Sequence, residues 1–421
     1  HCCCFSIINL CTSRLVCVNR NSLRTHLLQN IHHYIMSDAV RNYLPVKVIS
    51  VDSETKSEQN DVDRHNKPRL RRSLIISAFI EKYSHLVQVI NAPVSSNCDL
   101  VGLYSSVHDV GMIQFLVNSW SKWKAMGPDW DSDCCQPGWK GNTPPPLVPC
   151  HAAFRRDGIE RVSSNVMGAF GYYCTDSLTP IVESLVTELQ EDASIICEAV
   201  NLALLRNSVI YAATTHPGHH SNFDNFGGYC YLNNAALCAT LMQKRLDDTA
   251  GNRRVAIIDI DYHCGNGTAS IFYRVPDVFF TSIHCDPEIE YPFNAGYEDQ
   301  IGEGAGKGAT LHIPLAPGAT WEDYKPALEK AMNAIMEFDV GGLVVSMGLD
   351  TYEGDSVSVR KGGFKLKGND YVELGKIMGS YMRDNFMPSV FVQEGGYKMD
   401  VVGEAAADVL GGFSEGTRKA E

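Results

Sequence analysis

Long apolar stretches are missing from this sequence of 421 residues. No run approaches the roughly 18–20 apolar residues that a membrane-spanning helix needs, so we expect no membrane partner. Apolar residues make up 44% of the chain and charged residues 20%, which is typical of a globular protein with a substantial core. The length suits one large α/β domain or two average domains.

A basic surface is missing as well, because the net charge is −13 and the run RLRR at 69–72 is only a short patch. Proteins that grip nucleic acid usually carry a basic face, so we expect no nucleic-acid partner. A negative field attracts cationic substrates instead.

The spacing C-x-x-C is also absent, since none of the 15 cysteines is followed by another cysteine three residues later. The sequence therefore predicts a reducing compartment and mostly buried, inert thiols.

Acidic residues are absent from the first 34 positions, which carry Arg14, Arg20 and Arg24. An acid-poor, arginine-containing leader is typical of a transit peptide. Translated upstream sequence, with Met36 as the true start, explains residues 1–35 equally well. Neither interpretation makes this segment part of the fold. We expect a cytoplasmic protein, or a mitochondrial one if the leader is genuine.

Strands and helices alternate along the rest of the chain. The first expected strands lie at 46–52 and 86–93, and the first helices at 72–83 and 108–127. Continuously apolar strands separated by helices predict a parallel sheet covered on both faces. The later strands are expected at 208–213, 255–260, 278–283, 343–347 and 389–393, and the later helices around 183–206, 231–246, 321–337 and 370–386.

Residues 128–165 interrupt this pattern with turn residues, three successive prolines at 144–146 and no periodicity. Loops of this length inside a compact domain are usually functional or belong to an interface. A surface insertion without a function is the alternative.

Polar side chains follow five of the expected strands at their carboxyl ends. In parallel sheets the ligand site gathers at these ends. One histidine there is more often structural, and one aspartate usually caps a helix, but five such ends in one chain indicate a shared site. The segments are His216 to His220, Asp259 to His263, His284, Asp350, and Glu394 to Tyr397.

Three of these residues, Asp261, His263 and Asp350, are candidate metal ligands. Two carboxylates and one imidazole leave a coordination position open, as catalytic sites do and structural sites do not. Zn²⁺ fits this set, and Fe²⁺, Co²⁺ or Mn²⁺ also bind nitrogen and oxygen ligands. Asp259 could orient a neighbour or hold a monovalent ion through its oxygen atoms.

Proton transfer requires further groups beside the metal. His219 and His220 are adjacent and could flank the same water, with Asp259 and Asn266 as candidate partners for their second ring nitrogens. A charged partner makes one histidine more basic than the other and so separates an acid from a base. Tyr397 follows two glycines, and its phenol could donate to a developing oxyanion.

Several motifs resemble, in the right order, the successive blocks of the histone deacetylase superfamily: PGHHSNFDNFGGYCYLNNAA, DIDYHCGNGTASIFY, SIHCDPEIEYP, SMGLDTYEGD and QEGGY. HDVGM at 108–112 and FGYYC at 170–174 resemble its acetylpolyamine amidohydrolase branch. The resemblance covers residues 46–413. It implies one catalytic domain with the open arginase–deacetylase fold, an α/β fold whose central sheet is mostly parallel with helices on both faces.

The resemblance also implies roles. Asp261, His263 and Asp350 would hold zinc, His220 would be the general base with His219 as electrostatic partner or acid, and Tyr397 would polarise the scissile carbonyl. Asp259 and Asn266 match the partners of the two histidines. Family members bind potassium, and the matching positions here are Asp259, Asp261, His263, Ser282 and the Ile283 carbonyl.

Substrate binding is implied for Tyr229, which matches an aromatic wall of the substrate tunnel, and we expect Gly228, Met167, Ile289 and Tyr291 to join it. Two positions depart from the pattern. Cys264 stands where many members carry a second histidine, so we expect altered packing without loss of the metal. Met167 stands where the branch has an acidic residue that recognises the distal ammonium group of the substrate. Asp157, Glu160, Glu288 or Glu290 could take the place of that acidic residue.

The leading hypothesis is hydrolysis of an acetylated polyamine or a similar small cationic amide, by a homodimer formed through the 128–165 loop. The alternative is deacetylation of acetyl-lysine in proteins. Arginase-like hydrolysis with two manganese ions needs more bridging carboxylates than this sequence offers. A non-catalytic binding module is disfavoured because the metal ligands, both histidines and Tyr397 are all retained.

Overall fold

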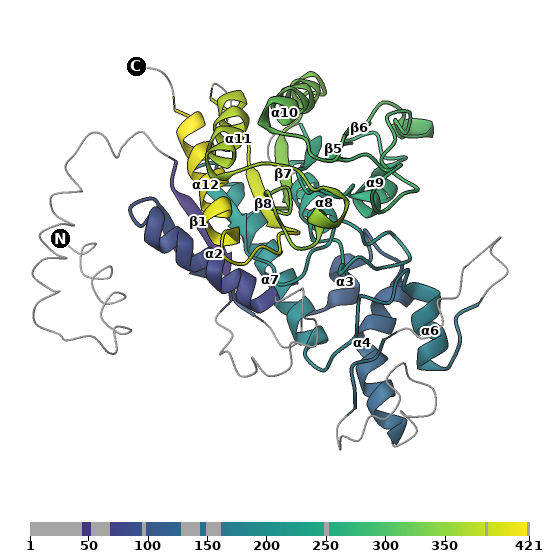
Figure 1. Ribbon diagram of the computed structural model, residues 1–421. Coiled ribbons are helices and arrows are strands. Elements are labelled where there is room, and N and C mark those ends of the chain that lie inside the picture. Colours follow the sequence, from purple (N-terminus) through teal and green to yellow (C-terminus); the bar gives the residue numbers. More distant parts are fainter. Residues whose placement is uncertain are drawn as a thin grey trace, which may run out of the picture. The chain divides into compact units, whose positions relative to one another are not determined.

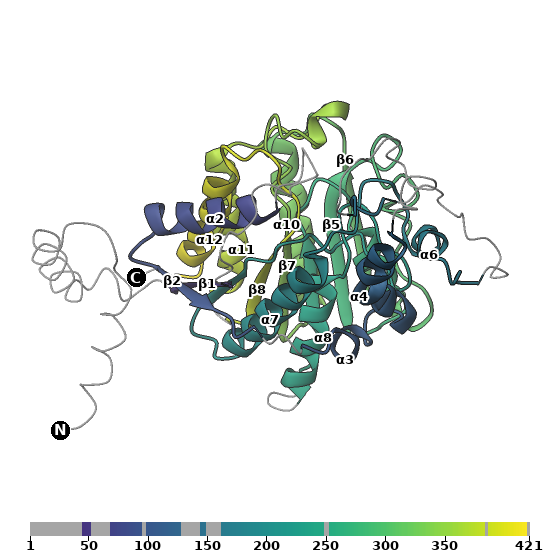
Figure 2. The ribbon, with the colours of Figure 1, turned by 90° about the horizontal axis from the view of Figure 1, so that it is seen from below.

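In the described residues, eight strands form a parallel sheet in the order β2-β1-β3-β8-β7-β4-β5-β6. Figure 2 shows β2 and β1 on the left, β8 and β7 in the middle, and β5 and β6 further to the right. The central strands β3, β4, β7 and β8 are buried at every position. Their continuously apolar sequences follow from burial on both faces. The strands are β1 (Val46–Ser50), β2 (Val87–Asn91), β3 (Val209–Ala212), β4 (Val255–Asp259), β5 (Val278–Cys285), β6 (Thr310–Leu315), β7 (Gly342–Met347) and β8 (Ser389–Gln393).

Helices cover both faces of this sheet (Figure 1). Side chains alternate along a strand, so Ile257 packs against one layer of helices and Ile258 against the other. The first layer contains α3 (Leu100–Tyr104), α4 (Val110–Ala125), α6 (Val166–Tyr173), α7 (Leu185–Ala203), α8 (Asn234–Asp247) and α9 (Asn266–Phe272). The second contains α2 (Pro68–Lys82), α10 (Trp321–Glu337), α11 (Gly368–Tyr381) and α12 (Val402–Gly416).

The computed structural model describes residues 44–51, 68–94, 98–127, 144–148, 161–247, 252–383 and 386–418, all within the unit Leu44–Glu421. The predicted leader, 1–35, lies outside the described residues, and so does most of the predicted loop at 128–165. Among the described helices, none combines the length and the apolar character needed to cross a membrane.

The predicted parallel sheet with helices on both faces is confirmed, and all the pairs between these strands are parallel. One strand, β6, was missed because its sequence, TLHIPL, contains Pro314. Proline removes a backbone donor and is confined to edge strands, and β6 lies at the edge of the sheet. The glycine-rich helix α12 was missed for its composition, since glycine lowers helix propensity.

Candidate active site

The predicted catalytic and metal-binding residues lie at the carboxyl ends of four strands that are neighbours in the sheet, β3-β8-β7-β4, and His284 lies within the next strand, β5. His219 and His220 follow β3, Tyr397 follows β8, and Asp350 follows β7. Asp259 ends β4, and Asp261 and His263 come directly after it. Because the strands are parallel, their carboxyl ends share one edge of the sheet, and the structure brings these residues together there.

The candidate metal ligands face one another. His263 Nδ1 lies 3.2 Å from Asp261 Oδ1 and 3.0 Å from Asp350 Oδ2. Zinc bonds of about 2.0–2.2 Å place two ligand atoms roughly 3–3.5 Å apart, so these distances fit one ion. Asp350 Oδ2 is buried and makes no well-directed hydrogen bond to a described residue, although buried polar atoms are nearly always satisfied. The three residues are therefore compatible with a metal cofactor.

Three acidic side chains meet at this point. Asp259, Asp261 and Asp350 are all fully buried. Burial and the charge of Asp261 raise the pKa of Asp350 to about 7. Burial alone would raise the pKa of Asp261 too, but His219 and His263 hold it below its usual value. A cation would relieve the repulsion between these carboxylates.

Gly395 brings the backbone unusually close to these carboxylates. Its N–H donates to Asp261 Oδ2 at 2.9 Å. A Cβ at this position would lie 2.4 Å from Asp261 Oδ2 and 2.8 Å from Asp350 Oδ2. A larger residue would displace two candidate ligands, which explains why the turn before Tyr397 begins with glycine.

The tandem histidines have different partners, as the sequence predicted. His219 Nδ1 donates to Asp259 Oδ2 at 2.9 Å, and His220 Nδ1 donates to Asn266 Oδ1 at 2.7 Å. Although burial opposes it, the charges of Asp261 and Asp259 raise the pKa of His219 to about 10. Burial, together with the charges of His219 and His263, lowers the pKa of His220 well below its usual value. At neutral pH, one imidazole is therefore charged and the other neutral.

Three residues that hold this arrangement were not assigned a role from the sequence. Asp355 accepts hydrogen bonds from the backbone N–H groups of Tyr397 (2.6 Å) and Lys398 (2.9 Å). Glu394 accepts from the N–H groups of Gly218 (2.6 Å) and His219 (3.1 Å). Asp355 thus fixes the backbone of Tyr397, and Glu394 fixes the segment that carries the two histidines.

The third residue is Arg71, which belongs to the short basic run RLRR at 69–72. Its side chain is fully buried, and its guanidinium carbon lies 5.5 Å from the centre of the Tyr397 ring. The guanidinium donates to the carbonyl oxygens of Thr215 and Gly396, both at 3.4 Å. Arg71 therefore joins α2 to the site, a role that its place in a short charged run did not indicate.

Two of the predicted substrate-binding residues lie against the catalytic candidates. The rings of Tyr229 and Tyr397 have centroids 5.8 Å apart, and those of Tyr291 and His220 are 4.8 Å apart. Tyr229 has a φ of +66°, in the left-handed region that bulky residues rarely adopt and that often marks functional sites. Gly228, beside it, donates its N–H to Asp176.

Two other predicted substrate residues, Met167 and Ile289, have apolar side chains. Met167 is half-buried on α6 and packs against the hydrophobic core, and Ile289 is 39% exposed. Their part in substrate binding stays a prediction. Glu288 is exposed and Glu290 half-buried in the loop after β5, whereas Asp157 and Glu160 lie outside the described residues.

The residues predicted to bind potassium are also neighbours. Asp259 and Ser282 are register partners on β4 and β5, and Ile283 follows Ser282. Asp259 Oδ1 accepts from the N–H of Asp261 at 3.1 Å. Ser282 Oγ donates to His284 Nδ1 at 2.8 Å, because the other nitrogen of that ring donates to a carbonyl. The identity of an ion at this place stays a prediction.

Comparisons with known proteins show the family to which this chain is similar. The histone deacetylase domain family matches residues 66–413. Acetylpolyamine amidohydrolase 1 of Pseudomonas aeruginosa is 37% identical over 312 residues, which are 74% of this chain and 82% of that protein. Acetylpolyamine amidohydrolase of Mycoplana ramosa is 34% identical over 308 residues, 73% of this chain and 82% of that protein.

Among solved structures, an acetylpolyamine aminohydrolase from Burkholderia pseudomallei superposes with a TM-score of 0.69. It is 24% identical, and the superposition covers 88% of this chain and 99% of that one. At this identity the likeness concerns the fold, which is the open arginase–deacetylase fold that the motifs implied. Match and superposition extend over most of the described chain, and the chain therefore belongs to the histone deacetylase superfamily, in its acetylpolyamine amidohydrolase-like branch.

Proposed function

We propose that this protein is a zinc-dependent amidohydrolase that removes the acetyl group from an acetylated polyamine or a similar small cationic amide. The observation that carries the proposal is the convergence of Asp261, His263 and Asp350 with the two histidines and Tyr397 at one edge of the sheet. The activities that the relatives' names state, at 34–37% identity, support the same reaction.

The metal's contribution is limited to one role: held by Asp261, His263 and Asp350, a zinc ion would polarise the amide carbonyl and make water easier to deprotonate. His220 donates its Nδ1 proton to Asn266, so its Nε2 keeps a free lone pair. Because burial and neighbouring charges keep the pKa of His220 low, this imidazole is neutral and can take the proton of the attacking water.

His219 and Tyr397 act as donors in this scheme. Protonated and paired with Asp259, His219 stabilises the developing negative charge and can deliver a proton to the leaving amine as the C–N bond breaks. Burial raises the pKa of Tyr397 well above its usual value, although Arg71 lowers it. Its hydroxyl therefore stays protonated and can donate to the oxyanion. The products are an amine and acetate.

Replacing Asp259 with asparagine should move the alkaline limb of the pH profile to lower pH. His219 works in its protonated form, so activity falls as pH rises through its pKa, which is about 10 with the Asp259 charge in place. Removing that charge lowers the pKa, and each unit corresponds to about 1.4 kcal/mol of lost interaction. The measurement is kcat/KM against pH at saturating potassium.

Asn266→Ala is the matched control for this change, because it removes the partner of His220 and leaves the Asp259–His219 pair intact. Its alkaline limb should stay in place. If the limb also stays in place in Asp259→Asn, His219 is not the acid.

Turnover of N-acetylputrescine and N8-acetylspermidine against an acetyl-lysine peptide tests the substrate class, using one metal-loaded preparation. Strong preference for the free polyamines supports the proposal. Preference for the peptide would favour protein deacetylation. Met167 suggests this alternative, because it stands where the branch has an acidic residue that recognises the distal ammonium group of the substrate. Tyr397→Phe serves as the control for activity from contaminating enzymes.

We propose that the catalytic metal is Zn²⁺ and not Fe²⁺ or Co²⁺. Analysis of which metal the active protein contains tests this choice.

We also infer a potassium ion between Asp259 and Ser282, since carboxylate and hydroxyl oxygens suit hard cations. The homodimer through 128–165 stays a prediction, because most of that loop lies outside the described residues.

A further inference from the structure

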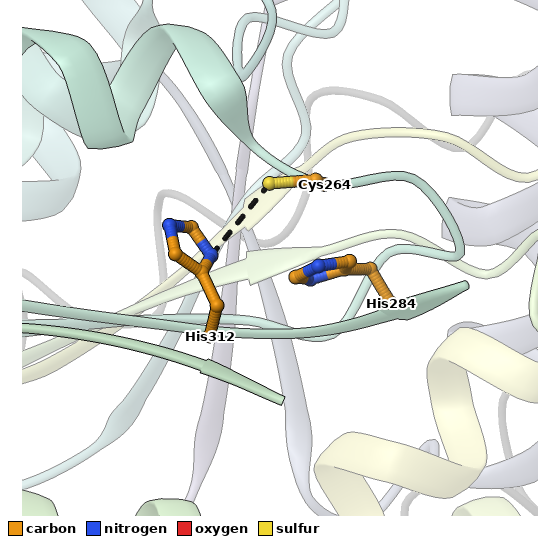
Figure 3. Close-up of side chains that lie close together, drawn as sticks. All are labelled: Cys264, His284 and His312. Atoms are coloured by element: carbon orange, nitrogen blue, oxygen red, sulfur yellow. Dashed lines mark hydrogen bonds between the residues drawn. The ribbon is translucent and has the colours of Figure 1, made fainter. Parts of the chain in front are cut away.

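A second cluster of potential metal ligands lies at the β5–β6 edge of the sheet, and it consists of Cys264, His284 and His312 (Figure 3). The three side chains are at most 1% exposed. One ligand atom of each lies within 4.8 Å of those of the other two. The proposed reaction uses none of them.

The fold brings these side chains together for a simple reason. Ser282 and His312 are register partners on β5 and β6, so His284, two residues after Ser282, projects from the same face as both. Cys264 follows the end of β4, the strand on the other side of β5. Three neighbouring strands thus contribute one ligand each.

The backbone of Gly296 lies beside the cluster. His284 Nε2 donates to the Gly296 carbonyl at 2.9 Å. Gly296 has a φ of +107°, and a Cβ there would lie 2.5 Å from His284 Nε2 and 3.1 Å from Cys264 Sγ. A side chain at this position would collide with the imidazole and press on the thiol, so a glycine is required beside the cluster.

His312 is poorly satisfied for a buried imidazole. Within the described part of the chain, its ring makes one hydrogen bond, to Cys264 Sγ at 3.8 Å. A thiol is a weak hydrogen-bonding group, and buried polar groups usually have better partners. The ring lies edge-on to His284, with centroids 5.4 Å apart. This long contact points to a partner between the imidazole and the thiol.

We propose that Cys264, His284 and His312 form a second metal site that takes one thiophilic ion of the Zn²⁺ class. Thiolate and imidazole ligands select zinc and similar ions over Mg²⁺ or Ca²⁺. Zinc bonds of about 2.3 Å to sulfur and 2.0–2.1 Å to nitrogen separate the two ligand atoms by roughly 3.5–3.8 Å, which fits the 3.8 Å between Cys264 Sγ and His312 Nδ1.

Binding has two local consequences. The thiol proton of Cys264 is released to solvent, because the thiolate is the ligand. His284 exchanges one of its present hydrogen bonds, to Ser282 or to Gly296, for the ion. The ion would then tie the segment that carries His263 to β5 and β6, beside the proposed catalytic metal but with different ligand chemistry.

Cobalt titration distinguishes the two sites, since Co²⁺ replaces Zn²⁺ and gives an intense sulfur-to-cobalt absorption band only where a thiolate is bound. The full chain is stripped with a chelator and titrated without oxygen. We expect two equivalents of Co²⁺ to bind, one of them with the sulfur band. Asp350→Asn should lose an equivalent and keep the band, which makes this test independent of the proposed catalytic reaction.

Cys264→Ser should lose the band and one equivalent, and His312→Asn should lose or greatly weaken both. Cys238→Ser is the matched control, because Cys238 is a fully buried thiol on α8 outside the cluster; it should keep the band. Uptake of one equivalent without a sulfur band by the unsubstituted chain overturns the proposal, and so does a band that survives in Cys264→Ser. Even if a variant fails to fold, the absence of a sulfur band in the unsubstituted chain overturns the proposal, whereas a band supports it only when Cys264→Ser removes it.

Discussion

Replacing Asp350 with asparagine should remove the catalytic metal and lower kcat/KM at least ~10³-fold, because a metal contributes several kcal/mol to the transition state and each 1.4 kcal/mol is tenfold. Asparagine keeps the shape but not the charge that faces His263 Nδ1 at 3.0 Å. Metal content by mass spectrometry and kcat/KM on N8-acetylspermidine measure the two effects. The control is Asp299→Asn, at an exposed position.

Loss of activity with the metal retained would place Asp350 in a different role, such as fixing the N–H of Tyr262, which donates to Asp350 Oδ1 at 2.9 Å. Retention of both metal and activity would contradict the proposed ligand set. Asp299→Asn should match the unsubstituted protein in both measurements.

Replacing Tyr397 with phenylalanine should lower kcat by about 10²–10³-fold with little change in KM, which is the usual effect of removing one oxyanion donor. The ring remains, so its contacts with Arg71 and Tyr229 are kept. A hydroxyl that acts only on the developing charge affects kcat more than substrate binding. Steady-state kinetics on the preferred substrate measure both constants.

Tyr104→Phe is the matched control, since Tyr104 is also buried and its hydroxyl donates to Asn234 Oδ1 at 2.6 Å. That change should lower thermal stability modestly, by about 0.5–1.5 kcal/mol for one hydrogen bond, and leave kcat unchanged. A Tyr397→Phe variant with kcat within a few-fold of the unsubstituted protein would show that the phenol only packs.

The convergence of the site could be predicted because parallel strands present their carboxyl ends at one edge. Asp261, His263, Asp350 and the two histidines follow directly from that rule. Arg71 could not be predicted, because a charged run in the sequence does not reveal which of its side chains is buried. Its burial depends on α2 packing against α12 and on the carbonyl groups of Thr215 and Gly396, to which its guanidinium donates.

Glu394 was counted among the polar residues at strand ends, but its role and that of Asp355 could not be predicted. Both accept hydrogen bonds from backbone N–H groups of other segments, and such partners leave no pattern in the sequence. Secondary structure was predicted best where burial is uniform, as in β4 and β7, and worst where the position in the sheet permits unusual residues, as for Pro314 in the edge strand β6. Met167 and Ile289 were assigned by motif alone, and their part in substrate binding stays a prediction.

The sheet order has a consequence for how the chain folds. The last strand in sequence, β8 (Ser389–Gln393), lies between β3 and β7, in the middle of the sheet. During synthesis, residues up to 388 can form at most two separate part-sheets, each with an exposed edge that invites pairing with other chains. Parallel pairing between distant segments is intrinsically slow. The two part-sheets can therefore join only when β8 has been synthesised and pairs with both β3 and β7. We expect ribosome-bound chains that end before Ser389 to need chaperone protection.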